Sequence, residues 1–148
     1  MKNIAIYCGS RSGHSSIYQE QAIEMAEVLA KNNIGLIYGG GAIGIMGHIA
    51  DTVLNHHGHV TGVIPSFLDK VEITHHGLSE LLVTKDMPER KNKMYELADG
   101  FIALPGGIGT LEELFEVFTW RQLSLHNKPI GVLNTNGYYN YLIQHIAH

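Results

Sequence analysis

The chain of 148 residues is long enough to enclose one hydrophobic core, and we expect a single domain covering residues 1–148. Its apolar content of 45% and charged content of 16% are typical of a globular protein and exclude a disordered chain. A formal net charge of −4 supplies no polybasic surface, so nucleic acid is not expected as a partner.

Cysteine usage and the N-terminal residues predict a cytoplasmic protein. The single cysteine, Cys8, excludes an internal disulfide and fits a reducing compartment. The first three residues run directly into "IAIYCGS", which leaves no room for a signal peptide, and no apolar run is long enough to span a membrane. The ten histidines lack the spacing of metal ligands, so we interpret them as exposed loop and helix-end residues and predict no metal.

Short apolar runs alternate with segments of helical period along the whole chain. Strands are predicted at residues 4–8, 34–38, 60–64, 81–84, 101–104 and 130–133. Helices are predicted between them, with apolar faces within residues 18–29, 45–53 and 111–118. This order predicts an α/β fold, a Rossmann-like doubly wound parallel sheet with helices on both faces. The longest irregular segment, "PSFLDKVEITHHGLS", lies between two strands, and loops of that length are usually functional or mobile.

Glycine-rich turns follow three of the predicted strands: "CGSRSG", "YGGGAIGIMG" and "LPGGIGT". Because parallel strands end at one edge of a sheet, these turns predict a shelf of backbone N–H groups that binds an anion. Gly39-x-Gly41-x-x-Gly44 matches the dinucleotide pattern, but no acidic residue ends a strand about 20 residues later. We therefore interpret these glycines as permitting tight turns and close packing.

The stretch "PGGIGTLEE" predicts a strand end, a turn open to a ligand, and a helix. Pro105 ends the strand, Gly106 and Gly107 let the backbone approach a ligand, and the helix is expected to start at Thr110. Two interpretations of Glu113 stay open at this point. Thr110-x-x-Glu113 is the pattern of a capping box, in which the glutamate only closes the helix N-terminus, and the alternative is a catalytic carboxylate.

A second stretch, "KDMPERKNKMYELADG", predicts a buried arginine. Asp86 suits a helix cap and the proline two residues later suits the first turn. Arg90 shares a helical stripe with Met94 and Leu97, which must face the sheet, so Arg90 is expected to point inward. An inward arginine needs an anionic partner, for which the candidates are Glu113 and a ligand phosphate.

These two stretches, "MPERK" and "PGGIGTLEE", resemble the signature of the LOG ("lonely guy") family, the cytokinin riboside 5′-monophosphate phosphoribohydrolases. The resemblance covers nearly the whole chain and includes "VEIT", "TWRQLSLHNKPIGVLN" and "NGYY". It implies an enzyme that hydrolyses the N-glycosidic bond of a nucleoside 5′-monophosphate, a homodimer, and no cofactor. The label lysine decarboxylase, often given to this family, is not supported, because no lysine stands in a recognisable pyridoxal phosphate setting.

The resemblance also implies site residues. The catalytic pair falls on Arg90 and Glu113. Substrate contacts fall on Glu72, Arg90, Lys91, Gly106, Gly107, Ile108, Gly109, Thr110, Leu111, Glu112, Glu113 and Thr119. Without the resemblance, Glu72 is interpreted as an exposed loop carboxylate and Thr119 as an ordinary hydroxyl on a helix face.

The implied chemistry assigns each group a role. Cleavage of an N-glycosidic bond develops positive charge on the sugar, which a Glu113 carboxylate at the anomeric carbon would stabilise. The helix N-terminus is expected to keep that carboxylate ionised, with Arg90 orienting it. The turn and helix N-terminus, from Gly107 to Thr110, would bind the 5′-phosphate, and Glu112 and Glu72 would contact ribose hydroxyls.

Two questions stay open in the sequence. A non-catalytic nucleotide-binding or carrier protein on the same fold is the alternative function, and the preferred base, cytokinin or adenine, depends on the shape of the pocket. Members of the family usually continue beyond the segment matching "NGYYNYLIQHIAH". The chain is therefore expected to be either a short natural member or a shortened one.

Overall fold

The computed structural model describes residues 1–11, 13–71 and 73–148. In chain order its elements are β1 (Asn3–Tyr7), α1 (Ser16–Lys31), β2 (Gly35–Tyr38), α2 (Gly44–Asn55), β3 (Val60–Pro65), η1 (Ser66–Leu68), β4 (Glu80–Thr84), α3 (Met87–Leu97), β5 (Gly100–Ala103), α4 (Ile108–Gln122), β6 (Ile130–Val132), η2 (Thr135–Gly137) and α5 (Asn140–Ala147). All six predicted strands are confirmed, each with its ends shifted by at most one residue.

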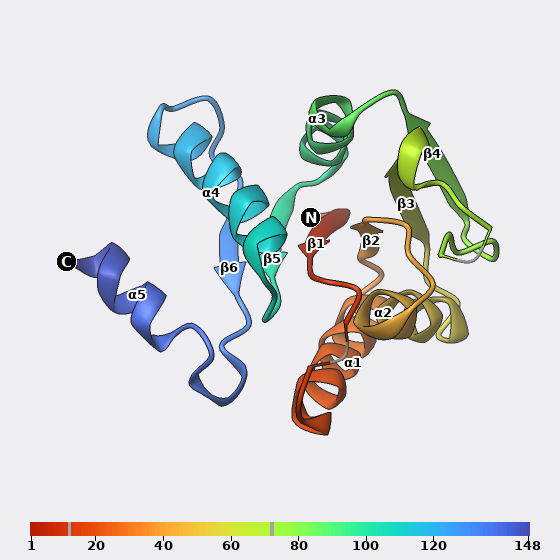
Figure 1. Cartoon of the computed structure of the whole chain (residues 1–148), viewed down its shortest axis with the longest axis horizontal. Helices are drawn as coiled ribbons and strands as arrows, with labels where there is room; N and C mark the ends of the chain where they lie inside the picture. The colour runs from red at the N-terminus through yellow and green to blue at the C-terminus, as the bar shows by residue number, and fades with distance from the viewer. Residues whose placement is uncertain (12, 72) are drawn as a thin grey trace.

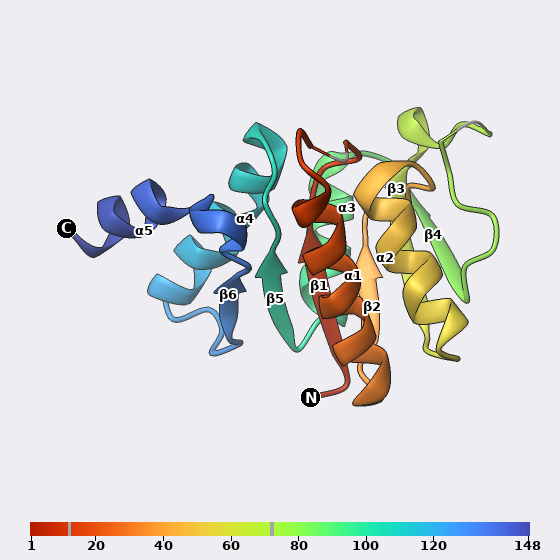
Figure 2. The ribbon, with the colours of Figure 1, turned by 90° about the horizontal axis from the view of Figure 1, so that it is seen from below.

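The strands form one parallel sheet in the order β4-β3-β2-β1-β5-β6. Helices α1 and α2 cover one face, α3 and α4 cover the other, and α5 lies beside β6 at one end of the sheet (Figure 1). The predicted Rossmann-like fold with helices on both faces is therefore confirmed. All strand arrows point the same way in Figure 2, so the loops that follow the strands gather at one edge.

The core has two layers because successive residues of a strand face opposite sides of the sheet. In β1, Ile4 and Ile6 pack with the buried side chains of α1 and α2. Ala5 and Tyr7 pack on the other face, with Met94 of α3 and residues of α4. The central strands are buried on both faces, which explains why they read as continuous apolar runs.

The direction of chain progression reverses between β1 and β5. From β1 the chain adds β2, β3 and β4 on one side, and it later adds β5 and β6 on the other. Ligands of doubly wound sheets bind where the strand order reverses, in the crevice outside the carboxyl ends of the strands. The topology therefore points to the loops that follow β1 and β5.

Helix α3 confirms most of what its sequence predicts. The Asp86 carboxylate caps the helix by accepting a hydrogen bond of 2.9 Å from the Glu89 N–H, and Arg90 and Met94 are buried. The expectation for Leu97 is wrong, since its side chain is 37% exposed. The chain leaves the helix at Ala98 to enter β5, and the small Ala98 side chain is buried instead.

The histidines are less uniform than predicted. His126 is buried, its Nε2 lies 2.9 Å from the Val117 carbonyl oxygen, and its ring packs against Tyr95 and Phe101. The expectation of an exposed histidine is therefore wrong at His126, because the loop after α4 folds back under that helix. Among the described helices, none combines the length and apolar character needed to cross a membrane.

Candidate active site

A pocket of about 950 Å³ opens where the topology predicts it, at the carboxyl ends of β1 and β5. Its walls come from the loop after β1, the start of α2, the start of α3, the Pro-Gly-Gly turn with the first turns of α4, and the segment before α5. The lining residues are Cys8, Gly9, Ser10, Arg11, Gly13, His14, Ser15, Tyr18, Ile45, Met46, Met87, Arg90, Lys91, Pro105, Gly106, Gly107, Ile108, Gly109, Thr110, Glu112, Glu113 and Tyr138.

Helix α4 starts at Ile108, two residues before the predicted start at Thr110. Gly107 is the N-cap residue and, among the described residues, no side chain makes the capping hydrogen bond. The capping-box interpretation is therefore wrong, because Thr110 already lies within the first turn and Glu113 in the second. Thr110 instead packs beneath the turn, where a Cβ added at Gly106 would overlap its hydroxyl. Among the residues that the structure describes, a Cβ at Gly107 or Gly109 would meet nothing within 4 Å, so the backbone there is open to the pocket.

Arg90 is buried and points inward as predicted, but its partners are carbonyl groups. Its Nε donates to the Val63 carbonyl oxygen and its Nη2 to the Gly39 carbonyl oxygen, both at 2.8 Å. Of the two candidate anionic partners, Glu113 forms no ion pair with Arg90, and a ligand phosphate stays a prediction. Burial lowers the pKa of Arg90, and the nearby Glu113 carboxylate opposes that shift.

Glu113 reaches the pocket from the second turn of α4, and its environment disfavours the charge. Burial raises its pKa from 4.5 to about 7, with Arg90 opposing the shift and Glu112 adding to it. Burial therefore works against the expected ionisation of this carboxylate, which is mostly protonated at acidic pH and ionises as the pH rises through about 7. A carboxyl group that titrates near neutrality in a pocket is a candidate general acid or base.

Lys91 lies between the two helices that carry the predicted catalytic pair. Its ammonium group binds the carboxylates of both Glu112 and Glu116, at 2.9 Å in the case of Glu116. These two hydrogen bonds raise the pKa of Lys91, and the one to Glu112 has the larger effect. Lys91 is thus a charged link between α3 and α4 that also faces the pocket.

Of the remaining predicted site residues, most are brought together and two are not. Gly106, Gly107, Ile108, Gly109, Thr110 and Glu112 line the pocket. Leu111 and Thr119 do not line it. Leu111 lies on another side of α4, and Thr119 lies near the far end of that helix. Glu72 lies outside the described residues.

The second glycine turn serves the site indirectly. Its glycines do not line the pocket, but Gly39 accepts from Arg90 and a Cβ there would overlap the guanidinium group. Gly44 has a φ of +62°, and a Cβ on it would overlap the Ser10 carbonyl of the first glycine turn. The interpretation of these glycines as devices for turns and close packing agrees with both contacts.

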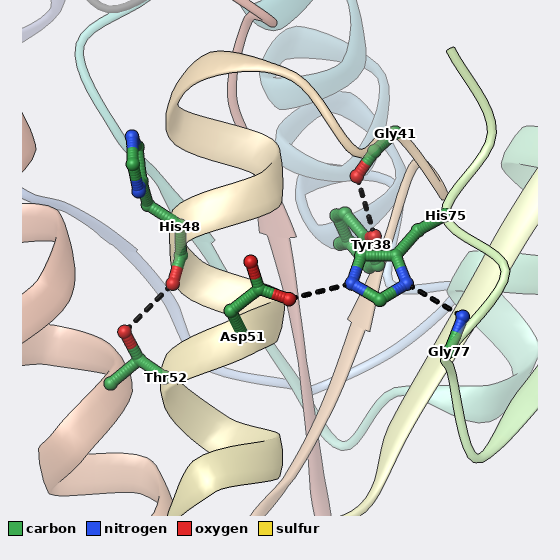
Figure 3. A network of polar contacts seen from close by, with 7 residues as sticks. All are labelled: Tyr38, Gly41, His48, Asp51, Thr52, His75 and Gly77. Atoms are coloured by element: carbon green, nitrogen blue, oxygen red, sulfur yellow. Dashed lines mark hydrogen bonds and ion pairs between the residues drawn. The ribbon is translucent and has the colours of Figure 1, made fainter. Parts of the chain in front are cut away.

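The irregular segment after η1 is fastened to this second turn and to α2. The His75 N–H donates to the Gly40 carbonyl and the Ala42 N–H to the Ile73 carbonyl, at 2.9 and 2.8 Å. The His75 ring lies between the Asp51 carboxylate, 2.7 Å from Nε2, and the Gly77 N–H, 3.0 Å from Nδ1 (Figure 3). Because a ring nitrogen that accepts from an N–H carries no proton, the proton of neutral His75 lies on Nε2.

Sequence reasoning missed several residues of the pocket wall, chiefly Tyr18, Met46 and Tyr138. The signal for Tyr138 is the Asn-Gly pair that precedes it, which predicts a turn. Asn136 and Gly137 do adopt positive φ angles, of 52° and 70°. That turn carries Tyr138 back to the carboxyl end of β5, from a position more than 30 residues beyond it in the chain.

Comparison with known sequences identifies the family. A family profile described as "Possible lysine decarboxylase" matches residues 46–148. A cytokinin riboside 5′-monophosphate phosphoribohydrolase of Arabidopsis thaliana is 50% identical over 98% of this chain and 68% of its own length. One of Rhodococcoides fascians is 48% identical over 99% of this chain and 75% of its own length. The chain therefore belongs to the cytokinin riboside 5′-monophosphate phosphoribohydrolase family, as the resemblance implied.

Solved structures support the fold. The molybdenum cofactor carrier protein of Chlamydomonas reinhardtii superposes with a TM-score of 0.77 at 18% identity, covering 99% of this chain and 85% of that protein. DNA processing protein A of Helicobacter pylori does so with a TM-score of 0.67 at 22% identity, covering 97% of this chain and 72% of that protein. Their different functions mean that the site, and not the fold, decides what this chain does.

Proposed function

We propose that the protein hydrolyses the N-glycosidic bond of a nucleoside 5′-monophosphate, a cytokinin riboside 5′-monophosphate or AMP, to the free base and ribose 5-phosphate. The observation that carries the proposal is the meeting of two groups in one pocket. Glu113 is a carboxyl group with a pKa of about 7, and the open turn at the start of α4 presents backbone N–H groups to an anion.

The phosphate anchors the nucleotide in this scheme. The first N–H groups of α4 have no partner within the helix, and the helix dipole favours negative charge beside them. Gly107 and Gly109 carry no side chain that would keep a phosphate away. Binding energy from this end of the substrate then holds the sugar against Glu113, one helical turn further along α4.

The reaction breaks the bond between C1′ of ribose and the base nitrogen and adds water at C1′. Ionised Glu113 stabilises the positive charge that develops on the sugar and accepts the proton of the attacking water. The departing base nitrogen keeps the electrons of the broken bond and takes a proton from solvent, and Glu113 returns its proton to solvent. Arg90 contributes positive charge from a fixed position, because two backbone carbonyls hold its guanidinium group. It acts on Glu113 through the electric field rather than by direct contact.

The test is to incubate the protein with AMP and with isopentenyladenosine monophosphate and to follow base and ribose 5-phosphate by chromatography. Glu113→Gln should reduce turnover about 10²- to 10⁴-fold while leaving the protein folded. Glu24→Gln, at an exposed position on α1, is the matched control and should leave turnover unchanged. Nucleotide binding without turnover by the unsubstituted protein would replace this proposal with the non-catalytic carrier function.

We also propose that the chain works as a cytoplasmic homodimer. The single cysteine, which is buried, supports the reducing compartment. Exposed apolar side chains on α4 and α5, including Phe115, Ile143 and Ile146, support self-association, because such surface is poorly accommodated by water. Light scattering coupled to gel filtration measures the mass, and a monomer at all concentrations would refute the dimer.

A further inference from the structure

Two consecutive tyrosines hold the turn that precedes α4. The Tyr139 hydroxyl donates to the Leu104 carbonyl oxygen at 2.5 Å and the Tyr138 hydroxyl to the Gly106 carbonyl oxygen at 2.6 Å. These carbonyls lie on either side of Pro105. The Leu104 N–H is in turn fixed to the Tyr7 carbonyl of β1 at 2.9 Å. The turn is therefore held from β1 and from the segment before α5 together.

The two tyrosines occupy different environments. Tyr139 is 2% exposed and belongs to the protein interior, and burial raises its pKa to about 12. Tyr138 is 45% exposed and lines the pocket, with its ring edge-on to Tyr18 of α1 at 5.9 Å between centroids. A tyrosine on the pocket wall whose hydroxyl reaches backward to the turn is placed to control the geometry of the turn.

The segment that carries the two tyrosines, residues 134–140, is itself held in a fixed turn. The Asn134 side chain accepts from the Tyr139 N–H at 2.7 Å and donates to the Asn140 side chain at 2.8 Å. Gly137 has a φ of +70°, a conformation that favours glycine. This tight turn lets adjacent tyrosines reach carbonyls two residues apart.

A peptide unit is planar and trans, so its C=O and N–H point in opposite directions. The hydrogen bond from Tyr138 fixes the Gly106 carbonyl and therefore the direction of the Gly107 N–H, which belongs to the same peptide unit. Gly107 is the N-cap residue of α4 and its backbone is open to the pocket. Because both residues of the Gly106–Gly107 peptide lack a side chain, they do not restrain its orientation sterically. A contact from elsewhere in the chain is needed to hold this peptide in one orientation.

We propose that Tyr138 is a positioning residue for the 5′-phosphate: its hydroxyl orients the Gly106–Gly107 peptide so that the Gly107 N–H and the first N–H groups of α4 converge on one anion. The inference rests on the proposed function for the identity of the anion. It predicts that loss of the hydroxyl weakens recognition of the phosphate and leaves the rest of the nucleoside unaffected.

The experiment compares Tyr138→Phe with Tyr141→Phe, a matched control at a position 86% exposed. Binding of AMP and of adenosine is measured by calorimetry, together with kcat and KM for AMP. Tyr138→Phe should weaken AMP binding and raise KM about fivefold, with adenosine binding and the unfolding midpoint nearly unchanged. Tyr141→Phe should change none of these quantities.

The outcomes separate this proposal from the proposed function. Equal loss of AMP and adenosine binding in Tyr138→Phe would overturn the positioning role, and so would unchanged AMP binding. If the unsubstituted protein binds AMP without hydrolysing it, the hydrolase proposal fails, and the ratio of AMP to adenosine affinity still decides the role of Tyr138.

Discussion

Arg90 and Glu113 line one pocket and influence each other's pKa, yet Arg90 donates hydrogen bonds to the Gly39 and Val63 carbonyls and not to Glu113. The guanidinium group therefore lowers the pKa of Glu113 without neutralising it in an ion pair. Burial outweighs this effect and leaves the Glu113 carboxyl with a pKa of about 7.

Glu113 should make stability depend on pH in a direction unusual for a carboxylate. Its folded-state pKa of about 7 exceeds the ordinary value of 4.5, so between these values the folded protein binds a proton that the unfolded chain has lost. The stability contributed is complete below about pH 4.5 and is lost as pH rises through 7. Relative to Glu113→Gln, the unsubstituted protein should lose on the order of 1–3 kcal/mol between pH 5 and 8.

Urea unfolding at pH 5, 6, 7 and 8 measures this difference. Glu24→Gln on α1 serves as the control, and its difference from the unsubstituted protein should stay constant over the same range. A Glu113→Gln difference that also stays constant would show that Glu113 does not titrate near neutrality in the folded state.

Lys91 and Glu112 should shift the pH dependence of hydrolysis in opposite directions. Lys91 lowers the pKa of Glu113 and Glu112 raises it. If ionised Glu113 is the active form, kcat/KM should rise with pH through about 7. Lys91→Met should then move this rise to higher pH, and Glu112→Gln should move it to lower pH.

The measurement is kcat/KM for AMP between pH 5 and 9. The substrate phosphate titrates near pH 6 in every case, so the comparison between variants carries the result. Shifts in the same direction for both variants would contradict the assignment of this titration to Glu113.

Gly39→Ala should displace Arg90 and destabilise the protein. A Cβ at Gly39 overlaps the guanidinium group, so Arg90 must give up its hydrogen bonds to the Val63 and Gly39 carbonyls to make room for it. We expect a loss of about 1–3 kcal/mol, together with reduced activity. Gly131→Ala is the matched control, because a Cβ there meets nothing within 4 Å. Equal unfolding free energies for the two variants would refute the packing argument.

The contact between Asp51 and His75 should restrain the segment that crosses the second glycine turn (Figure 3). Asp51 is half-exposed, so its removal should lower global stability by no more than about 1 kcal/mol. Hydrogen exchange is the more sensitive measurement. In Asp51→Ala, exchange at the Gly77 N–H should become faster, while His76→Ala, at an exposed position beside it, should leave the rate unchanged. An unchanged rate in Asp51→Ala would show that the backbone contacts alone hold the segment.

The sequence predicts the sheet well because the central strands are buried on both faces and the helices keep a clear apolar period. It also predicts that Arg90 points inward, from the spacing to Met94. It does not predict the hydrogen-bond partners of Arg90, because the carbonyls of Gly39 and Val63 lie far from Arg90 in the chain and no local pattern indicates them. It fails at Glu113 for a similar reason, because its pKa depends on burial by elements far apart in the sequence.

The start of α4 shows a local limit of the same kind. Thr110 is a favoured capping residue, and sequence alone placed the helix start there. The structure starts the helix at Ile108, and the Thr110 side chain packs against Gly106 instead of capping the helix. Local reasoning can predict the turn before Tyr138 but not the contact of Tyr138 with Gly106, which joins two turns separated by α4 and β6.

The close packing of the glycine turns limits how the substrate range of this enzyme can be changed. A side chain at Gly106, on the pocket wall, would overlap Thr110, and one at Gly44, in the turn behind the wall, would overlap the Ser10 backbone, so neither glycine can be replaced by simple substitution. Variation is easier where side chains already form the wall, as at Tyr18, Met46 and Ile108. Laboratory evolution toward a different nucleobase should therefore accumulate changes at these wall positions and leave both glycines untouched.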